Sequence, residues 1–355
     1  MFVYFTDLHA HNFPTCSVIG EDGVNSRLHD ALGVIDQVCG YAVKHKIKTI
    51  VFGGDMFHDR KRIPVDVSSL VYKTWFRQVA KHSFDLHFLV GNHDRSASVP
   101  METSLAPLSQ IGRVYDRPTK VKFQGAYAGF IPYSENGQEL RRVLKQFRGC
   151  RVIFMHQGVQ GVVSRSGYAL EGECLKKSDL ALAPLILSGH IHEQQEVTRK
   201  GRQLLIYPGS CMQHDWGDVR SKKYFHVYDL SIMNRRHPKF HKQVETDAPR
   251  FVNLGMGDDP PADKNVFVRF SALSPDDLRH ARKLSAALSA SGVRYVAPPI
   301  VGPTSLTLPE EVEQTEPLLI GDMLSKYVAA NVKGKKRRAR LERVGKELLH
   351  EATST

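Results

Sequence analysis

The chain has 355 residues, 41% of them apolar, and a formal net charge of +12 at pH 7. This length and composition suffice to bury a large core without disulfides. No apolar run approaches the roughly 18 residues of a membrane-spanning helix, so the sequence excludes a protein with such helices. The five cysteines are scattered and odd in number, and no signal peptide precedes the first apolar run, so we expect a cytoplasmic protein.

Short apolar runs rich in Val, Ile, Leu and Phe predict the buried strands of an α/β fold. These runs are residues 2–5, 49–52, 86–90, 152–155 and 185–187. Apolar residues recur at helical spacing over 28–42 and again over 67–79, which predicts two βαβ crossovers. Residues 121–131, 195–207 and 223–230 predict further short strands, and therefore a second sheet.

A polar cluster follows each of the five apolar runs. The clusters are Asp7-Leu8-His9, Gly54-Asp55, Gly91-Asn92-His93-Asp94, His156-Gln157-Gly158 and Gly189-His190-Ile191-His192. Open α/β sheets gather their ligands at strand ends, so these clusters are expected to meet there. Together they can build a two-metal hydrolase centre.

The residue types in the clusters suit a pair of divalent ions. Two ions roughly 3.5–4 Å apart repel each other and need a bridging carboxylate, for which Asp55 is the natural candidate. The expected ligands of one ion are Asp7, His9 and His192, and those of the other are Asn92, His156 and His190. This mixture of imidazole, carboxylate and amide oxygen suits Mn²⁺, Fe²⁺ or Zn²⁺ better than Mg²⁺ or Ca²⁺.

The ordered set of motifs resembles the calcineurin-like metallophosphoesterase superfamily. Within it, residues 53–58 (Gly-Gly-Asp-Met-Phe-His), 207–210 (Tyr-Pro-Gly-Ser) and 215–217 (Asp-Trp-Gly) resemble the SbcD-type DNA-repair nucleases, which have phage relatives. The resemblance is close over about residues 1–230. It implies an α/β fold in which two sheets pack face to face with helices outside, and a cap that binds DNA.

The resemblance also suggests catalytic residues. His93 follows a predicted ligand and is given the role of stabilising the transition state or protonating the leaving oxygen. His58 stands where protein phosphatases of the superfamily usually have Asp, a departure that favours the nuclease branch and makes His58 a second candidate. What orients His93 stays open: Asp59 is one candidate, and a surface ion pair between Asp59 and Arg60 is the alternative. Asp94 is a further possible site residue.

A lone histidine after a strand is usually only a hydrogen-bonded polar residue. The prediction of a metal centre therefore rests on seven candidate positions that occur in the expected order, and not on any one of them.

Three regions are predicted along the chain. Residues 1–240 form the metallophosphoesterase domain, residues 241–308 form the cap, with a helix at 275–290 and strands at 265–270 and 293–297, and residues 309–355 form a helical, basic tail. The tail has an amphipathic pattern at 318–328 and eight Lys or Arg against one Glu at 333–346. Such a run is most often a solvated tail, but it can also bind phosphates. The family resemblance implies docking on a coiled-coil, SMC-like ATPase.

The sequence thus predicts a DNA exonuclease and endonuclease of repair, recombination or replication, with two divalent ions and Mn²⁺ as the first choice. Its expected partners are DNA, the ATPase and a second copy of the chain, with no membrane. A small-substrate phosphodiesterase or protein phosphatase on the same fold is one alternative. A noncatalytic DNA-end-binding scaffold is another, and the complete set of candidate ligands argues against it.

Overall fold

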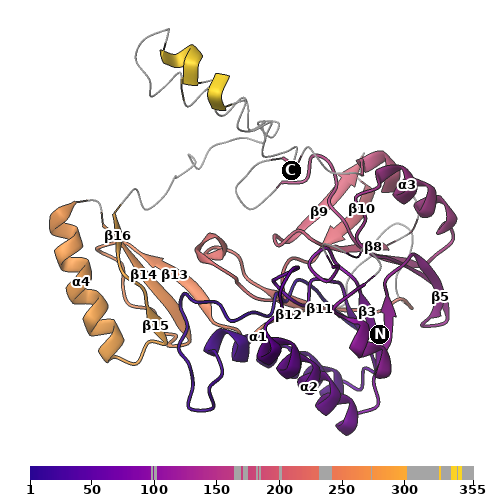
Figure 1. Ribbon diagram of the computed structural model, residues 1–355, viewed down its shortest axis with the longest axis horizontal. Coiled ribbons are helices and arrows are strands. Elements are labelled where there is room, and N and C mark those ends of the chain that lie inside the picture. The colour runs from indigo at the N-terminus through magenta and orange to yellow at the C-terminus, as the bar shows by residue number, and fades with distance from the viewer. Residues whose placement is uncertain are drawn as a thin grey trace.

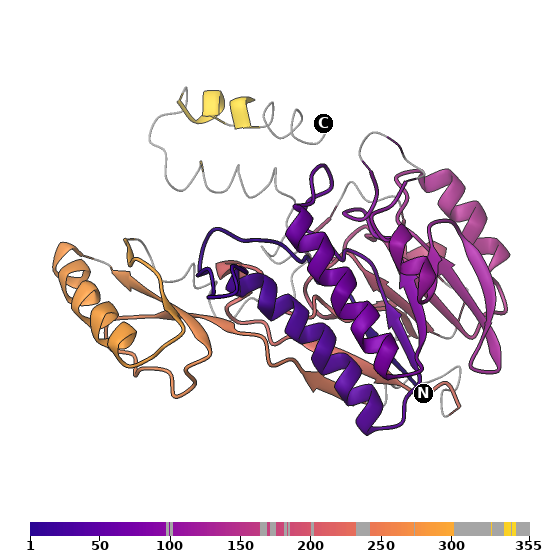
Figure 2. The ribbon, with the colours of Figure 1, turned by 60° about the horizontal axis from the view of Figure 1, so that its bottom comes forward.

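The computed structural model describes residues 1–96, 99, 102–163, 169–170, 175–180, 183, 185–199, 202–231, 242–272, 274–301, 328, 337–341 and 343–345. These residues build two six-stranded sheets and a smaller third sheet, seen in Figures 1 and 2. None of the described helices combines the length and the apolarity needed to cross a membrane.

The first sheet has the strand order β12-β11-β1-β2-β3-β4. Its strands are β1 (Phe2–Phe5), β2 (Thr49–Phe52), β3 (Asp85–Leu89), β4 (Arg113–Tyr115), β11 (Tyr224–Tyr228) and β12 (Lys242–Glu245). Strands β1 to β4 are parallel, while β11 runs antiparallel to β1 and β12 antiparallel to β11. The ends of β1, β2 and β3 that precede the polar clusters therefore lie along one edge.

The second sheet has the order β5-β6-β7-β8-β10-β9. Its strands are β5 (Thr119–Phe123), β6 (Ala126–Ile131), β7 (Val152–His156), β8 (Leu185–Gly189), β9 (Gln195–Arg199) and β10 (Arg202–Tyr207). Strands β6, β7, β8 and β10 are parallel, so the carboxyl ends of β7 and β8 also meet at one edge.

The layers are helix, sheet, sheet and helix. Helices α1 (Ser26–Lys44) and α2 (Val65–Lys81) pack on the outer face of the first sheet, and α3 (Gly137–Gln146) packs on the outer face of the second. Figure 2 shows α1 and α2 side by side. Between the sheets, aromatic residues such as Phe2, Phe130 and Phe154 form a shared core. The predicted two-sheet sandwich with outer helices is confirmed. The short helix α3, which has Asn136 as its N-cap, was not anticipated.

A third sheet follows in the chain and lies to one side of the two larger sheets (Figures 1 and 2). It contains β13 (Arg250–Leu254), β14 (Val266–Ala272), β15 (Tyr295–Val296) and β16 (Ile300–Val301), and α4 (Pro275–Ala290) packs on it. Parallel β14 and β15 with α4 between them form the expected β-α-β unit. Strand β12 falls within the range expected for the cap, but it pairs with β11, so the first sheet extends past residue 240.

Arg27 on α1 connects this third sheet to the first. Its buried guanidinium lies 5.1 Å from the ring of Phe251 and 5.0 Å from that of Phe267, and it donates hydrogen bonds to the carbonyls of Gln213 and His214. Desolvated cation–π contacts of this kind contribute on the order of 2 kcal/mol each. The cap sheet is thus attached to the loop that carries His214.

In the C-terminal region, residues 337–341 and 343–345 are helical, in agreement with the helical spacing predicted there. The predicted helix at 318–328 lies outside the described residues, apart from Val328.

Candidate metal centre

The polar clusters that follow β1, β2, β3, β7 and β8 meet in one place. The segments after β1 and β2 remain hydrogen-bonded beyond the strands, since Asp7 N donates to Gly54 O at 2.9 Å and His9 N to Asp55 O at 3.0 Å. From the second sheet, His190 N donates to a carboxylate oxygen of Asp7 at 3.1 Å. All seven residues predicted as ligands are brought together at the junction of the two sheets: Asp7, His9, Asp55, Asn92, His156, His190 and His192.

Four of these residues have a left-handed backbone. The φ angles are 55° for Asp7, 46° for His9, 59° for Asp55 and 83° for His190. A non-glycine residue in this region costs on the order of 1–3 kcal/mol and persists only where its surroundings hold it. This backbone conformation turns the side chains off their strand ends and into the common site, and strain of this kind is common at functional sites.

Glycines make room for this arrangement. A Cβ on Gly91 would lie 2.1 Å from Asp55 Oδ1, and one on Gly54 would lie 2.4 Å from His156 Nδ1. Gly189 is equally confined, since its Cβ would lie 2.6 Å from His156 Nδ1. The glycines predicted from the sequence motifs are therefore required by close packing against the site residues.

Asp55 is the carboxylate at the centre of the site. Its Oδ2 lies 3.3 Å from His156 Nε2 and 3.6 Å from His9 Nε2, so it faces histidines from both sheets. Asp55 also belongs to two groups whose donor atoms all lie within 4.8 Å of one another, one with Asp7 and His156 and one with His9 and His93. This is the position expected of a bridging ligand.

Asn92 occupies the second half of the site. Its Oδ1 lies 3.1 Å from His156 Nε2 and 3.0 Å from His190 Nδ1. On the other side, His9 Nε2 lies 3.0 Å from His192 Nε2, and His192 Nε2 lies 3.8 Å from Asp7 Oδ1. The donor atoms therefore gather in the two sets predicted from the sequence, with Asp55 between them.

The hydrogen bonds of the histidines fix which nitrogen is available as a ligand. His156 Nδ1 donates to the carbonyl of Gly53 at 2.8 Å, because a carbonyl can only accept, and this leaves Nε2 facing Asp55. Metal-bound histidines in proteins are commonly oriented by such a bond from the other ring nitrogen.

The buried carboxylates of the site require positive charge nearby. Asp7 and Asp55 are 0% and 2% exposed, and a buried carboxylate is costly unless a positive charge compensates it. Burial alone would lower the pKa of His156, but Asp55 and Asp7 outweigh this and raise it to about 9. Burial lowers the pKa of His9 and of His192, which keeps these rings neutral and able to coordinate.

His214 is a candidate ligand that the sequence motifs do not predict. Its donor atom lies within 4.8 Å of those of His9 and His192, and its Nε2 donates to the carbonyl of Asp7 at 3.1 Å. Its other ring nitrogen, Nδ1, is buried without a hydrogen-bond partner among the described residues. His214 does not follow a predicted strand directly, but it lies between two segments already noted, 207–210 and 215–217.

The catalytic candidates His93 and His58 lie beside this group. The rings of His93 and His9 are 4.8 Å apart, and those of His93 and His58 are 5.9 Å apart. His93 N donates to Asp55 Oδ1 at 2.8 Å, and His93 Nδ1 donates to the backbone carbonyl of His58. His58 thus orients His93 through its main chain.

Both expectations for Asp59 are wrong. Asp59 does not orient His93, and its carboxylate accepts from His11 Nε2 at 3.1 Å in place of an ion pair with Arg60. The carbonyl of His58 accepts from His93 Nδ1 and so has the orienting role for which Asp59 was one candidate. Arg60 instead lines two cavities beside the site.

Asp94 holds the backbone of two site segments together. Its carboxylate accepts hydrogen bonds from the backbone N–H groups of Asp55, Met56 and Gly91 at 2.7, 2.8 and 3.0 Å. Burial and the Asp55 carboxylate raise the pKa of Asp94 to about 7, while the N–H donors oppose that shift. Asp94 therefore ties the strand end that carries Asp55 to the loop that carries Asn92.

The residues present fit two divalent ions. Two buried carboxylates, an amide oxygen and imidazole nitrogens supply the mixed donor set of such a site.

Comparison with known proteins gives the same family as the motifs. A model of the calcineurin-like phosphoesterases matches residues 1–194. Exonuclease subunit 1 of Enterobacteria phage T4 is 28% identical over 207 residues, which are 55% of this chain and 57% of that protein. The match thus spans little more than half of the phage protein's length.

Two solved structures were also found. A dimetal phosphatase from Danio rerio is 14% identical, with a TM-score of 0.38 over 58% of this chain and 85% of that one. A single mutant of Vps29 from Entamoeba histolytica is 11% identical, with a TM-score of 0.27 over 63% of this chain and 83% of that one.

Replacing Gly91 with Ala tests the packing of the centre. The new Cβ would meet Asp55 Oδ1 at 2.1 Å and Asp55 N at 2.6 Å, so the central carboxylate must move. We predict that Gly91→Ala weakens Mn²⁺ binding, measured by calorimetry, about 10- to 100-fold.

Gly40→Ala is the matched control, since Gly40 lies on the exposed face of α1 with nothing within 4 Å of its Cβ position. It should bind Mn²⁺ like the wild type and be more stable by about 0.5–1 kcal/mol. Equal metal affinity in the two variants would contradict the tight packing around Asp55.

Proposed function

The chain belongs to the calcineurin-like phosphoesterase family, and we propose that this metal-dependent phosphoester hydrolase acts on DNA, as an exonuclease and endonuclease. The observation that carries the proposal is the grouping of the other six predicted ligands around Asp55, with His93 beside them. The ions held by such a set supply Lewis-acid stabilisation of the phosphate and an activated water.

His93 is the candidate for proton transfer. Because Nδ1 donates to the carbonyl of His58, the ring is held with Nε2 as its remaining group, and a protonated ring can donate from Nε2 to a leaving oxygen. The second bond, from His93 N to Asp55, ties the backbone of His93 to the metal centre. His58 contributes mainly by positioning, through its carbonyl and its ring.

Two observations favour DNA over a small phosphoester. Similarity to an exonuclease subunit of a phage covers more than half of the chain. The formal net charge of +12 suits a polyanionic substrate, since neutralised phosphates dominate nucleic-acid affinity.

A variant of His93 separates chemistry from binding. We predict that His93→Ala retains bound Mn²⁺ and near-normal DNA affinity but hydrolyses single-stranded DNA about 10²–10⁴-fold more slowly. Asp55→Ala should lose both metal and turnover, and EDTA should abolish the activity of the wild type.

His29→Ala is the control, because His29 is exposed, bonds Asp22 and lies outside the groups of candidate ligands. Loss of metal from His93→Ala would overturn its catalytic role. Wild-type protein that hydrolyses p-nitrophenyl phosphates but no DNA would favour the small-substrate alternative, and DNA binding without any hydrolysis would favour the scaffold.

We further propose that the tail docks on a coiled-coil, SMC-like ATPase, and that the complex contains a homodimer of this chain and serves DNA repair, recombination or replication. Leu341 and Val344 support the docking, since they lie three residues apart in the helical tail and are 41% and 38% exposed. Such apolar side chains among arginines suit a partner helix. Mn²⁺ is the proposed physiological ion, and the cytoplasm is the proposed compartment.

Truncation before Glu316 tests this role of the tail. The candidate metal ligands all precede residue 215, so hydrolysis of a small chromogenic phosphodiester should be unchanged. We predict that the truncated protein no longer co-purifies with the ATPase at moderate salt.

If the tail binds only DNA, the truncated protein should still bind the ATPase. The slope of log affinity for DNA against log salt concentration should then become shallower by about 0.7–0.9 for each lost phosphate contact. Unchanged partner binding and unchanged salt dependence would contradict both roles and leave a solvated tail.

A further inference from the structure

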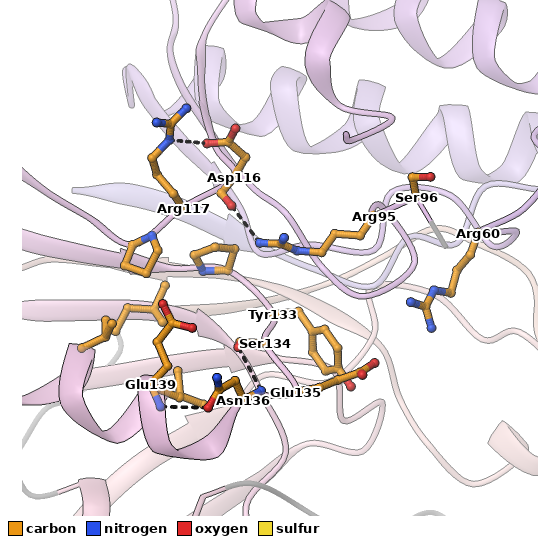
Figure 3. Close-up of a pocket in the computed structure, with 15 residues that line it drawn as sticks. Arg60, Arg95, Ser96, Asp116, Arg117, Tyr133, Ser134, Glu135, Asn136 and Glu139 are labelled. Atoms are coloured by element: carbon orange, nitrogen blue, oxygen red, sulfur yellow. Dashed lines mark hydrogen bonds and ion pairs between the residues drawn. The ribbon is translucent and has the colours of Figure 1, made fainter. Parts of the chain in front are cut away.

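A cavity of about 560 Å³ lies beside the metal centre, between the two sheets and α3. Its wall includes Arg60 from the loop after β2, Arg95 from the loop after β3, and Tyr133 and Glu135 from the segment between β6 and α3. Figure 3 shows Arg60, Arg95 and Tyr133 around one opening, whereas the guanidinium of Arg117 turns toward Asp116. Cavities of roughly 300–1,000 Å³ are the usual size for small ligands.

The cavity adjoins the proposed reacting groups on two sides. The ring of Tyr133 lies 5.6 Å from the ring of His190, and Tyr133 N donates to Val90 O, just before the Gly91-Asn92-His93 segment. A second cavity of about 280 Å³ is lined by His93 and shares Arg60 and Arg95 with the first. A ligand at His93 can therefore continue past the two arginines to Tyr133.

The two arginines suit a phosphate. The guanidinium of Arg95 is held by a hydrogen bond of 2.7 Å to the carbonyl of Asp116 and is half-buried. Although burial lowers its pKa, an arginine stays charged at any physiological pH. Arg60 is exposed and lies at the point where the two cavities meet. Guanidinium groups match phosphate oxygens in geometry and charge.

The part of the cavity wall at Tyr133 suits a base better than a phosphate. Tyr133 offers an aromatic ring, and stacking of a base on such a ring contributes about 1–3 kcal/mol without regard to sequence. The carboxylates of Glu135 and Glu139 also line this part of the cavity, and they disfavour a second phosphate while they can accept from a base amino group. Phosphate at the arginines and base at Tyr133 is thus the orientation that the charges support.

We propose that this pocket holds one unpaired nucleotide next to the phosphodiester bond that is cut, with its phosphate on Arg60 and Arg95 and its base against Tyr133. The proposal rests on the proposed function and specifies its substrate. A base in a duplex stack cannot enter a cavity, so the strand must be unpaired beside the cut. Single-stranded ends, gaps and hairpin loops would be hydrolysed in preference to intact duplex.

The test compares Tyr133→Ala with Tyr127→Ala, an equally large truncation of an exposed tyrosine on β6, away from the cavity. The measured quantity is kcat/KM with Mn²⁺ for a single-stranded oligonucleotide and for methyl p-nitrophenyl phosphate. Tyr133→Ala should lose about 10- to 100-fold on the oligonucleotide and little on the small diester. Tyr133→Phe should retain the wild-type rate, and Arg60→Ala should raise KM for the oligonucleotide where Arg148→Ala does not.

An oligonucleotide with an abasic site beside the cut tests whether Tyr133 contacts the base. In the wild type, removing the base beside the cut should slow hydrolysis as much as Tyr133→Ala does, and in Tyr133→Ala it should have no further effect. Equal oligonucleotide rates for Tyr133→Ala and Tyr127→Ala would overturn the pocket while leaving the proposed function intact. An equal loss on the small diester would also overturn it, because Tyr133 would then act through His190. A wild type that hydrolyses only the small diester would instead contradict the proposed function.

Discussion

The structure depends on the burial of two carboxylates, Asp7 and Asp55, at neighbouring strand ends. Isolated buried carboxylates are too costly to persist as anions without compensation. The need for positive charge shows at His156, whose pKa the carboxylates raise in spite of burial. To act as a ligand His156 must release that proton, and a divalent ion then supplies the compensating charge in its place. The remaining histidines of the site are neutral where burial lowers their pKa, so they offer lone pairs and not charge. Divalent cations satisfy both requirements at once.

The need to compensate the buried carboxylates explains several energetically unfavourable features of the structure. The left-handed backbone at Asp7, His9, Asp55 and His190 and the close approach of Gly91 to Asp55 are unfavourable by themselves. They persist because the surrounding contacts hold them, among them the three backbone bonds to Asp94. Arg27 links the cap sheet to the site. It donates hydrogen bonds to the carbonyls of Gln213 and His214, and its guanidinium packs against Phe251 and Phe267 in the cap sheet.

The sandwich and most of the site were predictable because strand ends and motif order are local properties of the sequence. Short buried strands read directly as apolar runs, and a polar residue just after a parallel strand must lie at the sheet edge. The contacts that were missed are not local. His214 reaches the site from a loop, and His93 is oriented by a backbone carbonyl, which no side-chain pattern reveals. Asp59 pairs with His11, 48 positions away in the chain. The cavity at Tyr133 likewise depends on how three loops meet.

We expect Asp55 to be shared between two ions. The most direct measurement is anomalous diffraction from crystals of the wild-type protein grown with Mn²⁺. We predict two manganese peaks about 3.5–4 Å apart, both bound by Asp55, with Asn92 on one ion and His192 on the other. A single peak, or two peaks of which only one contacts Asp55, would contradict it.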